Sequence, residues 1–257
     1  MKKIILVVFL VVLGIRFFAQ GPPITTETPI MLGLGGNGIR TFGKLIVKEN
    51  VSVYVHPIAI PYNITPKFQV GAIVPFKRVA INNGPSTNGL ADVAFFSKYQ
   101  LYKKDEKAKT FRVLARYIQR FPTAKTSETP SLGMGLYESY FGLVVGRITS
   151  KIGMYGDAGI TIKEGAGSES LPYNLSVGIP LLPQQYPQKQ INTFLEFNGN
   201  YVFQSQVHEL FLSPGVQYIP GRRLLLETSF QYPVLQQNIT ENKTLYRWML
   251  GARLLIN

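Results

Sequence analysis

The sequence predicts an all-β protein, a transmembrane antiparallel up-and-down β-barrel of about 12 strands. Three observations lead to this prediction. The chain begins with an export signal, it contains many segments of about ten residues in which apolar and polar residues alternate, and the gaps between these segments are alternately short and long.

The first twenty residues have the composition of a secretory signal peptide. Lys2 and Lys3 precede an apolar run that ends at Ile15, and Ala19 is a small residue of the kind that precedes a cleavage point. Arg16 interrupts the run, which is shorter than the roughly 20 apolar residues of a spanning helix. An uncleaved anchor is the alternative. Removing this segment would leave 24 basic residues against 14 acidic ones, a formal net charge of +10 instead of +13.

We therefore divide the chain into residues 1–20 as signal peptide, residues 21–37 as a flexible N-terminal segment and residues 38–257 as the barrel. The stretch "GLADVAFFSKYQLYKK", residues 89–104, shows the alternation clearly, since Phe95 and Tyr99 fall on one face while Asp92 and Lys98 fall on the other. Similar alternation predicts the other strands, at 39–48, 51–61, 67–76, 110–121, 139–148, 152–162, 172–182, 191–201, 208–218, 224–234 and 245–256.

The gaps between the predicted strands support a membrane barrel, which has short turns at one end and longer loops at the other. "NITPK", "KKDEKAK", "TSK" and "IPGRR" are mostly short, whereas "KRVAINNGPSTNG", "PTAKTSETPSLGMG", "KEGAGSES" and "LQQNITENK" are longer. "PQQYPQK" and "KEN" break the rule. An even number of strands predicts that both termini lie at the same, periplasmic end.

Composition alone leaves a soluble β-sandwich open, because 46% of the residues are hydrophobic and 16% are charged. Aromatic residues near the strand ends would form interfacial girdles in a membrane barrel and would belong to the core of a sandwich. The chain has no cysteine, so disulfides and thiolate metal sites are impossible. Beyond the predicted signal peptide, residues 1–20, no apolar run is long enough for a transmembrane helix.

Several segments, taken in order, resemble a known family. They are "GLADVAFFSKYQL", "YIQRFPTAKT" with "LGMGLYESYFGL", "LFLSPGVQY", "LLLETSFQYPVLQ" and "YRWMLGARL". Together they are similar to the outer-membrane barrels called "MetA-pathway of phenol degradation", or transporter-like, over about residues 45–257.

This resemblance implies a Gram-negative, porin-like outer-membrane barrel with a role in the uptake of small molecules, including aromatic or hydrophobic ones. It supplies no catalytic residues. Two positions depart from the family pattern. Ala124 stands where a glycine is typical, and the chain ends in Asn257 instead of an aromatic residue.

The charged residues on the polar strand faces predict a lumen. Basic side chains alternate with acids along the strands, whereas nucleic-acid binding requires clustered basic residues. We therefore expect no nucleic-acid partner. Arg112, Arg116 and Arg120 form a positive ladder on one strand face, with Glu196 and Glu227 as candidate partners. The predicted lumen charge lattice consists of Asp92, Lys98, Arg112, Arg116, Arg120, Arg147, Asp157, Glu196, Glu209, Glu227, Arg247 and Arg253. A purely structural lattice without a transport role is the alternative.

The residues around each candidate motif argue against a cofactor site, a metal site or a catalytic site. "GLGGNG", residues 33–38, matches a dinucleotide-binding pattern, but no strand precedes it and no helix follows it. Two histidines, His56 and His208, are too few for most metal sites. An outer-membrane lipid hydrolase would need a Ser–His pair, and neither Ser52 nor Ser205 can reach its nearest histidine within one extended strand. Cross-strand pairing of either histidine stays open.

The sequence thus predicts a non-enzymatic barrel without cofactor or metal, exported to the outer membrane, where lipid surrounds it. The predicted function is a narrow channel or transporter for small molecules of unknown identity. The alternative is a structural or partner-binding barrel with a plugged lumen. The sequence leaves open whether residues 21–37 form that plug.

Overall fold

A computed structural model describes residues 21–165, 169–182 and 189–256, so the predicted signal peptide lies outside the described residues. The described part is all-β and contains thirteen strands. They are β1 (Gly38–Lys48), β2 (Val51–Thr65), β3 (Phe68–Ile81), β4 (Ser86–Leu90), β5 (Ala94–Glu106), β6 (Lys109–Arg120), β7 (Glu138–Thr149), β8 (Gly153–Lys163), β9 (Ser170–Pro180), β10 (Gln190–Val202), β11 (Val207–Ile219), β12 (Leu224–Gln237) and β13 (Thr244–Leu255).

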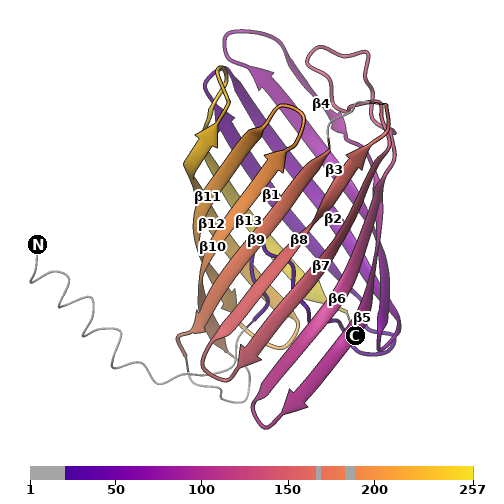
Figure 1. Ribbon diagram of the computed structural model, residues 1–257, viewed down its shortest axis with the longest axis vertical. Coiled ribbons are helices and arrows are strands. Elements are labelled where there is room, and N and C mark those ends of the chain that lie inside the picture. Colours follow the sequence, from indigo (N-terminus) through magenta and orange to yellow (C-terminus); the bar gives the residue numbers. More distant parts are fainter. Residues whose placement is uncertain (1–20, 166–168, 183–188, 257) are drawn as a thin grey trace, which may run out of the picture.

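The strands close into an antiparallel barrel with twelve strand positions around its wall (Figure 1). Apart from β4 and β5, which both pair with β3, each strand pairs with its neighbours in the sequence, and β1 pairs with β13 to join the two edges. The thirteen strands occupy only twelve positions because β4 and β5 lie end to end beside β3: β4 pairs with the second half of β3 and β5 with the first half. The predicted fold class is confirmed.

The predicted single strand at residues 89–104 is interrupted in the structure at residues 91–93. The interruption lies beside Pro75, which has no backbone N–H to donate and which faces Pro57 across the β2–β3 ladder. At this point the Ala91 N–H donates to the Pro75 carbonyl, at 2.8 Å, and the regular ladder resumes at Ala94. The loop predicted at residues 77–89 is correspondingly short, because β3 continues to Ile81 and β4 begins at Ser86.

The outer face of the barrel is apolar. Phe95 is 55% exposed whereas Phe96, the next residue, is 8% exposed, as expected for side chains that alternate across the wall. Phe141, Leu143, Phe230 and Trp248 are likewise exposed on the outside. Because closure pairs the backbone around the whole circumference, this wall suits contact with hydrocarbon. Among the described residues, no helix is long and apolar enough to cross a membrane.

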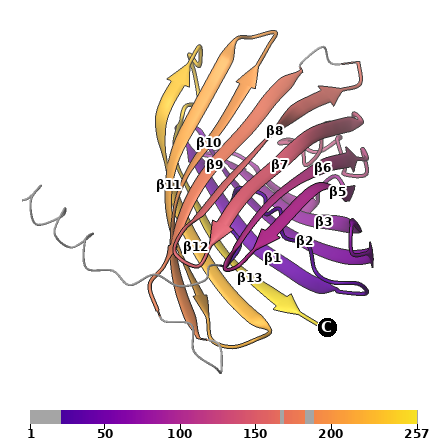
Figure 2. The same cartoon turned by 60° about the horizontal axis from the view of Figure 1, so that its bottom comes forward.

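The two ends of the barrel differ. Gly38 pairs with Leu255, so the start of β1 and the end of β13 meet at one rim, which we call the terminal rim (Figure 2). This rim carries the turns at 66–67, 107–108, 150–152 and 220–223. The opposite rim, which we call the loop rim, carries the loop of residues 121–137. The two ends of the barrel thus lie at the same rim, as predicted, and the periplasmic location of this rim stays a prediction.

Charge on the outer face should destabilise the barrel. We expect Phe95→Arg and Phe230→Arg each to lower the free energy of unfolding by about 2 to 4 kcal/mol in lipid vesicles, because an arginine near the membrane midplane must leave water. Tyr102→Arg is the control, since Tyr102 lies on β5 beyond the end of its pairing with β3. Urea titration, read out by heat-dependent migration on a gel, measures the effect. Equal stability of all three variants would contradict the lipid-facing assignment.

Candidate functional site

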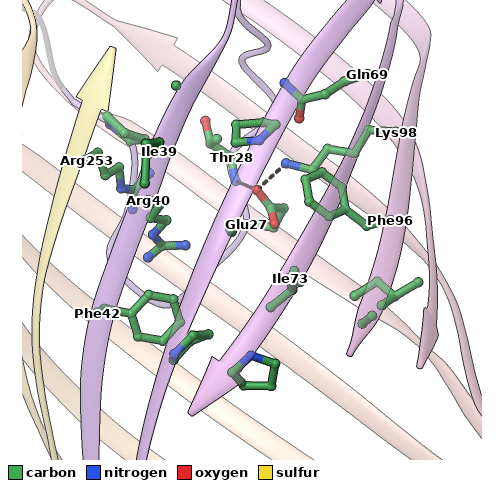
Figure 3. Close-up of a pocket in the computed structure, with 18 of the residues that line it drawn as sticks. Glu27, Thr28, Ile39, Arg40, Phe42, Gln69, Ile73, Phe96, Lys98 and Arg253 are labelled. Carbon is green, nitrogen blue, oxygen red and sulfur yellow. Dashed lines mark hydrogen bonds and ion pairs between the residues drawn. The ribbon is translucent and has the colours of Figure 1, made fainter. Parts of the chain in front are cut away.

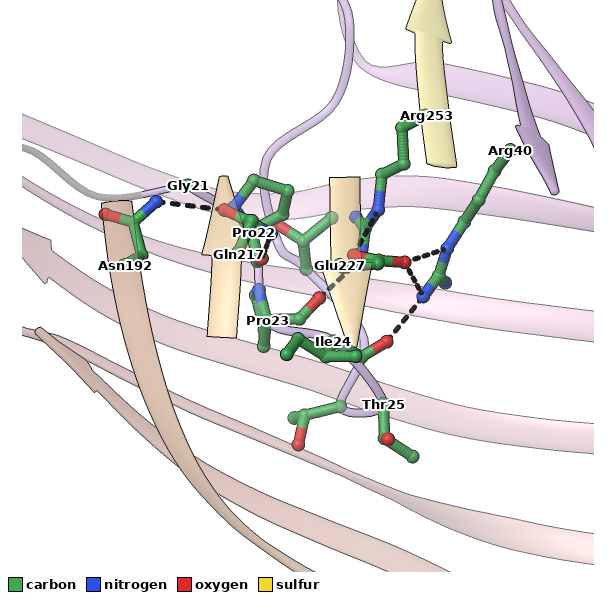
Figure 4. A network of polar contacts seen from close by, with 12 residues as sticks. Gly21, Pro22, Pro23, Ile24, Thr25, Arg40, Asn192, Gln217, Glu227 and Arg253 are labelled. Atoms are coloured by element: carbon green, nitrogen blue, oxygen red, sulfur yellow. Dashed lines mark hydrogen bonds and ion pairs between the residues drawn. The ribbon is translucent and has the colours of Figure 1, made fainter. Parts of the chain in front are cut away.

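Most of residues 21–37 lies inside the barrel, where the sequence alone predicts only a flexible segment, and the exposed Leu34 lies where the chain returns to the rim. Four consecutive carbonyl groups near its start accept hydrogen bonds from the wall (Figure 4). The Tyr155 hydroxyl donates to the Gly21 carbonyl at 3.2 Å and the Gln217 amide donates to the Pro22 carbonyl at 2.8 Å. Arg253 donates to the Pro23 carbonyl at 2.6 Å, and Arg40 donates to the Ile24 carbonyl. We call residues 21–37 the N-terminal segment.

The Glu196 carboxylate holds the next part of this segment. It accepts hydrogen bonds from the backbone N–H groups of Ile24 at 2.7 Å, Thr25 at 3.0 Å and Thr26 at 2.7 Å. The Thr26 hydroxyl donates to it as well, at 2.8 Å. Glu196 is 0% exposed, so these donors replace the water that the carboxylate loses. Since Glu196 lies midway along β10, the segment reaches the middle of the barrel.

Glu27 connects the N-terminal segment to the basic side chains on β5 and β6. Its carboxylate binds the Lys98 ammonium at 2.7 Å and the Arg116 guanidinium at 3.1 Å. Its backbone N–H donates to Asp157 at 2.7 Å. Sequence reasoning considered only strand residues as partners of Arg116 and missed Glu27. The available signal was that Glu27 is the single charged residue between residues 21 and 39.

The N-terminal segment returns to the rim from which it entered. The Gly35 N–H donates to the Asn63 carbonyl at 3.1 Å, and the Asn63 N–H donates to the Gly36 carbonyl at 3.0 Å. Asn37 then bridges to Tyr62 on β2, and β1 begins at Gly38. Because Asn63 is close to the terminal-rim end of β2, the segment enters and leaves the lumen through the same rim.

The three arginines of the predicted ladder lie on the inner face of β6 but do not act as one unit. Arg112 lies 3.7 Å from Asp105 near the terminal rim. Arg116 binds Glu27 at mid-height, and Arg120 pairs with Glu138 near the loop rim. Each arginine thus has a different acid, and neither Glu196 nor Glu227 pairs with any of the three.

The remaining members of the predicted lattice lie inside the barrel with one exception. Arg247 pairs with Glu209 at 3.3 Å, and Glu227 binds Arg253 at 2.9 Å and Arg40 at 3.0 Å. Arg147 lies on the outer face, contrary to prediction. It has the same parity on β7 as the exposed Phe141, Leu143 and Val145, and its cross-strand neighbours Phe111 and Met154 are also exposed.

Asp92 anchors the loop of residues 121–137 across the loop rim. Its carboxylate accepts hydrogen bonds from the backbone N–H groups of Ala124 at 2.9 Å and Met134 at 3.2 Å. The Lys77 ammonium donates to the Leu132 carbonyl at 2.9 Å, and the Leu132 side chain is buried. The break at residues 91–93 releases Asp92 from the regular strand and makes this contact available.

A cavity of about 920 Å³ remains between the N-terminal segment and one side of the wall (Figure 3). Its lining extends from Arg222 and Leu255 at the terminal rim to Leu132 and Lys163 at the loop rim. One side is formed by inward-facing residues of β2 and β3 whose side chains have no hydrogen-bonding groups, namely Val55, Pro57, Ala59, Pro61, Ile73 and Pro75. Ten basic and three acidic residues also line it. We call this cavity the passage.

Both histidines lie on the outer face and pair across strands. The Thr41 hydroxyl is 2.7 Å from His56 Nε2, and the Tyr54 hydroxyl is 2.9 Å from His56 Nδ1. The Tyr173 hydroxyl is 2.8 Å from His208 Nε2. Neither histidine forms a hydrogen bond with Ser52 or Ser205, the serines considered for a lipid hydrolase. In the part of the chain that the structure covers, no group of three or more potential ligands could hold a metal ion.

Comparison with known proteins establishes the fold. No protein-family model matches the chain, and no curated protein matches it. An outer membrane channel from Pseudomonas putida F1 superposes with a TM-score of 0.68 at 12% identity, covering 92% of this chain and 100% of that one. The β domain of the Bordetella autotransporter Brka gives 0.53 at 12% identity, covering 87% and 100%. The KdgM porin gives 0.52 at 9% identity, covering 85% and 99%. The chain therefore has the fold of outer-membrane β-barrels, among them channels and porins, while the more specific resemblance to the phenol-degradation family remains a prediction.

Proposed function

We propose that the protein is an outer-membrane channel that admits small molecules through the passage. The observation that carries this proposal is a cavity of about 920 Å³ whose lining includes residues at both rims. The signal-like composition of residues 1–20 and the apolar outer face support a location in the outer membrane.

The lining of the passage favours small molecules that combine an apolar body with a negative charge. Six inward-facing residues of β2 and β3, from Val55 to Pro75, offer apolar surface without hydrogen-bonding side chains, and basic residues outnumber acidic ones in the whole lining. An excess of fixed positive charge raises the local concentration of anions. Aromatic or hydrophobic carboxylates fit both features.

The N-terminal segment narrows this channel from within. Its contacts with Glu196, and those of its own Glu27 with Lys98 and Arg116, favour the alternative of a closed, structural barrel as long as the segment stays in place. In our proposal the segment sets the conductance instead, because the passage runs beside it along the β2–β3 wall.

Loosening the N-terminal segment should increase conduction. We expect Glu196→Ala to raise single-channel conductance in planar bilayers, because three backbone N–H groups and the Thr26 hydroxyl lose their charged acceptor. Asn200→Ala, on the same strand but without a hydrogen bond or ion pair to residues 21–37, should conduct like the unmodified protein. Absence of conductance in all three proteins would favour the structural barrel and contradict the channel.

Ion selectivity should depend on depth along β6. We expect Arg116→Glu to reduce or reverse a preference for anions, because Arg116 lines the passage. Arg112→Glu should change selectivity less, since Arg112 lies near the terminal rim and does not line it. Reversal potentials in a salt gradient measure both. An equal effect of the two substitutions would mean that the ladder acts as a unit, against the separate pairing described above.

A lipid-ester hydrolase is the second candidate, favoured by the hydrogen bond between Thr41 and His56 on the outer face. We place it second because the hydrogen bonds of His56 go to the Thr41 and Tyr54 hydroxyls and, among the described residues, to no carboxylate that would stabilise a protonated imidazole. We expect no release of fatty acid from phospholipid vesicles by the unmodified protein. Release that disappears in Thr41→Val would establish the hydrolase instead.

A further inference from the structure

Lys44 is a lumen cation in apolar surroundings. It lies on the inner face of β1 and lines the passage. Its cross-strand neighbours are Val55 on β2 and Met249 on β13, and Phe42 precedes it by two residues on the same face. Val55 and Phe42 also line the passage, whereas Met249 is buried in an apolar cluster against which Phe42 packs. Lys44 is therefore flanked within the wall by apolar residues on β2, on β13 and on its own strand.

The other cations within the lumen, away from its rims, have partners. Glu227 binds Arg40 and Arg253, Glu27 binds Lys98 and Arg116, Glu209 binds Arg247, and the Leu132 carbonyl accepts a hydrogen bond from Lys77. Lys44 has neither a hydrogen bond nor an ion pair with any residue that the structure describes.

The acids that act on Lys44 electrostatically are already engaged. They are Glu209 and Glu196, and Arg247 opposes them. Glu209 is paired with Arg247, and Glu196 is surrounded by the N–H groups of the N-terminal segment. A partly buried ammonium without a counterion is costly, so an anion that reaches it gains an ion pair without displacing an existing one.

We propose that Lys44 is the binding site for the carboxylate of a small apolar molecule in the passage, with the apolar body against Phe42, Val55 and Pro57. A single unpaired cation matches one negative charge, and the apolar neighbours match a ring or short hydrocarbon instead of a sugar. This inference rests on the proposed function, because a ligand must enter through the passage. It names the class of ligand, an apolar monocarboxylate, and the residue that selects it.

Calorimetric titration of the full barrel in detergent tests the site, with benzoate, benzyl alcohol and acetate as probes. Benzoate carries both the ring and the charge, benzyl alcohol lacks the charge and acetate lacks the ring. We expect benzoate to bind about tenfold more tightly than either of the others, equivalent to about 1.4 kcal/mol. Equal binding of benzoate and benzyl alcohol, or no binding of benzoate, would overturn the proposal.

Variants at Lys44 separate its charge from its shape. Lys44→Met keeps most of the side-chain length and should lose the preference for benzoate, whereas Lys44→Arg should keep it. Lys104→Met is the matched control, because Lys104 projects at the β5–β6 hairpin with 62% of its side chain exposed. Unchanged benzoate binding in Lys44→Met would overturn the proposal. If Lys44→Met fails to fold, the comparison of probes on the unmodified protein and on Lys44→Arg still decides.

Bilayer recordings distinguish failure of the site from failure of the channel. Benzoate binding that depends on Lys44, without conductance, would support the site and contradict the proposed channel. Conductance without Lys44-dependent binding would support the channel and overturn the site. If the protein both conducts and binds benzoate at Lys44, benzoate should reduce the current of the unmodified protein at concentrations that leave the current of Lys44→Met unaffected.

Discussion

The pairing of β1 with β13 is the constraint on which the rest of the structure depends. In hydrocarbon every backbone N–H and C=O needs a partner within the protein, and an open sheet would leave two edges without one. The ladder between Gly38 and Lys48 on one side and Leu255 and Thr244 on the other removes both edges. Once the barrel is closed, the number and stagger of its strands set the width of the lumen. Everything inside the barrel must therefore fill or line a space that the wall defines.

The two sides of the lumen meet this requirement differently. The inner faces of β8 to β12 carry amide, hydroxyl and carboxylate groups, and the N-terminal segment lies where these groups can satisfy its irregular backbone. The inner faces of β2 and β3 that line the passage carry mostly proline, alanine, valine and isoleucine, with Gln69 and Lys77 as polar side chains on β3. A chain without regular secondary structure would find few hydrogen-bond partners there for its N–H and C=O groups. The open passage lies on the side where the wall is least able to hold a backbone.

The sequence predicts the wall better than its contents. Buried and exposed side chains alternate along strands such as β5 and β12, and apolar and polar residues alternate in the sequence in the same way. The fold class and most strand positions therefore follow from alternation alone. The period is ambiguous where both faces are apolar. This explains the error at Arg147, in a stretch where Val144 faces inward and Val145 outward, and it hides the apolar inner face of β2. The contacts of the N-terminal segment depend on residues more than 100 positions away, as between Thr26 and Glu196, and no local pattern records them. The sequence does not distinguish Lys44 from the other lysines, because its special feature is the lack of an ion pair, which only its neighbours in the folded barrel reveal.

The course of the N-terminal segment through a single rim has a topological consequence. A segment threaded from one rim to the other could leave only after its free end had travelled the whole length of the barrel. This one is a loop inserted from one side, and its far end continues into β1 at the rim where it started. The ladder that closes the barrel joins Gly38–Lys48 to Thr244–Leu255, so the closing pairs do not include residues 21–37. The covalent continuation of the segment into β1 ties it to the rim at which it enters.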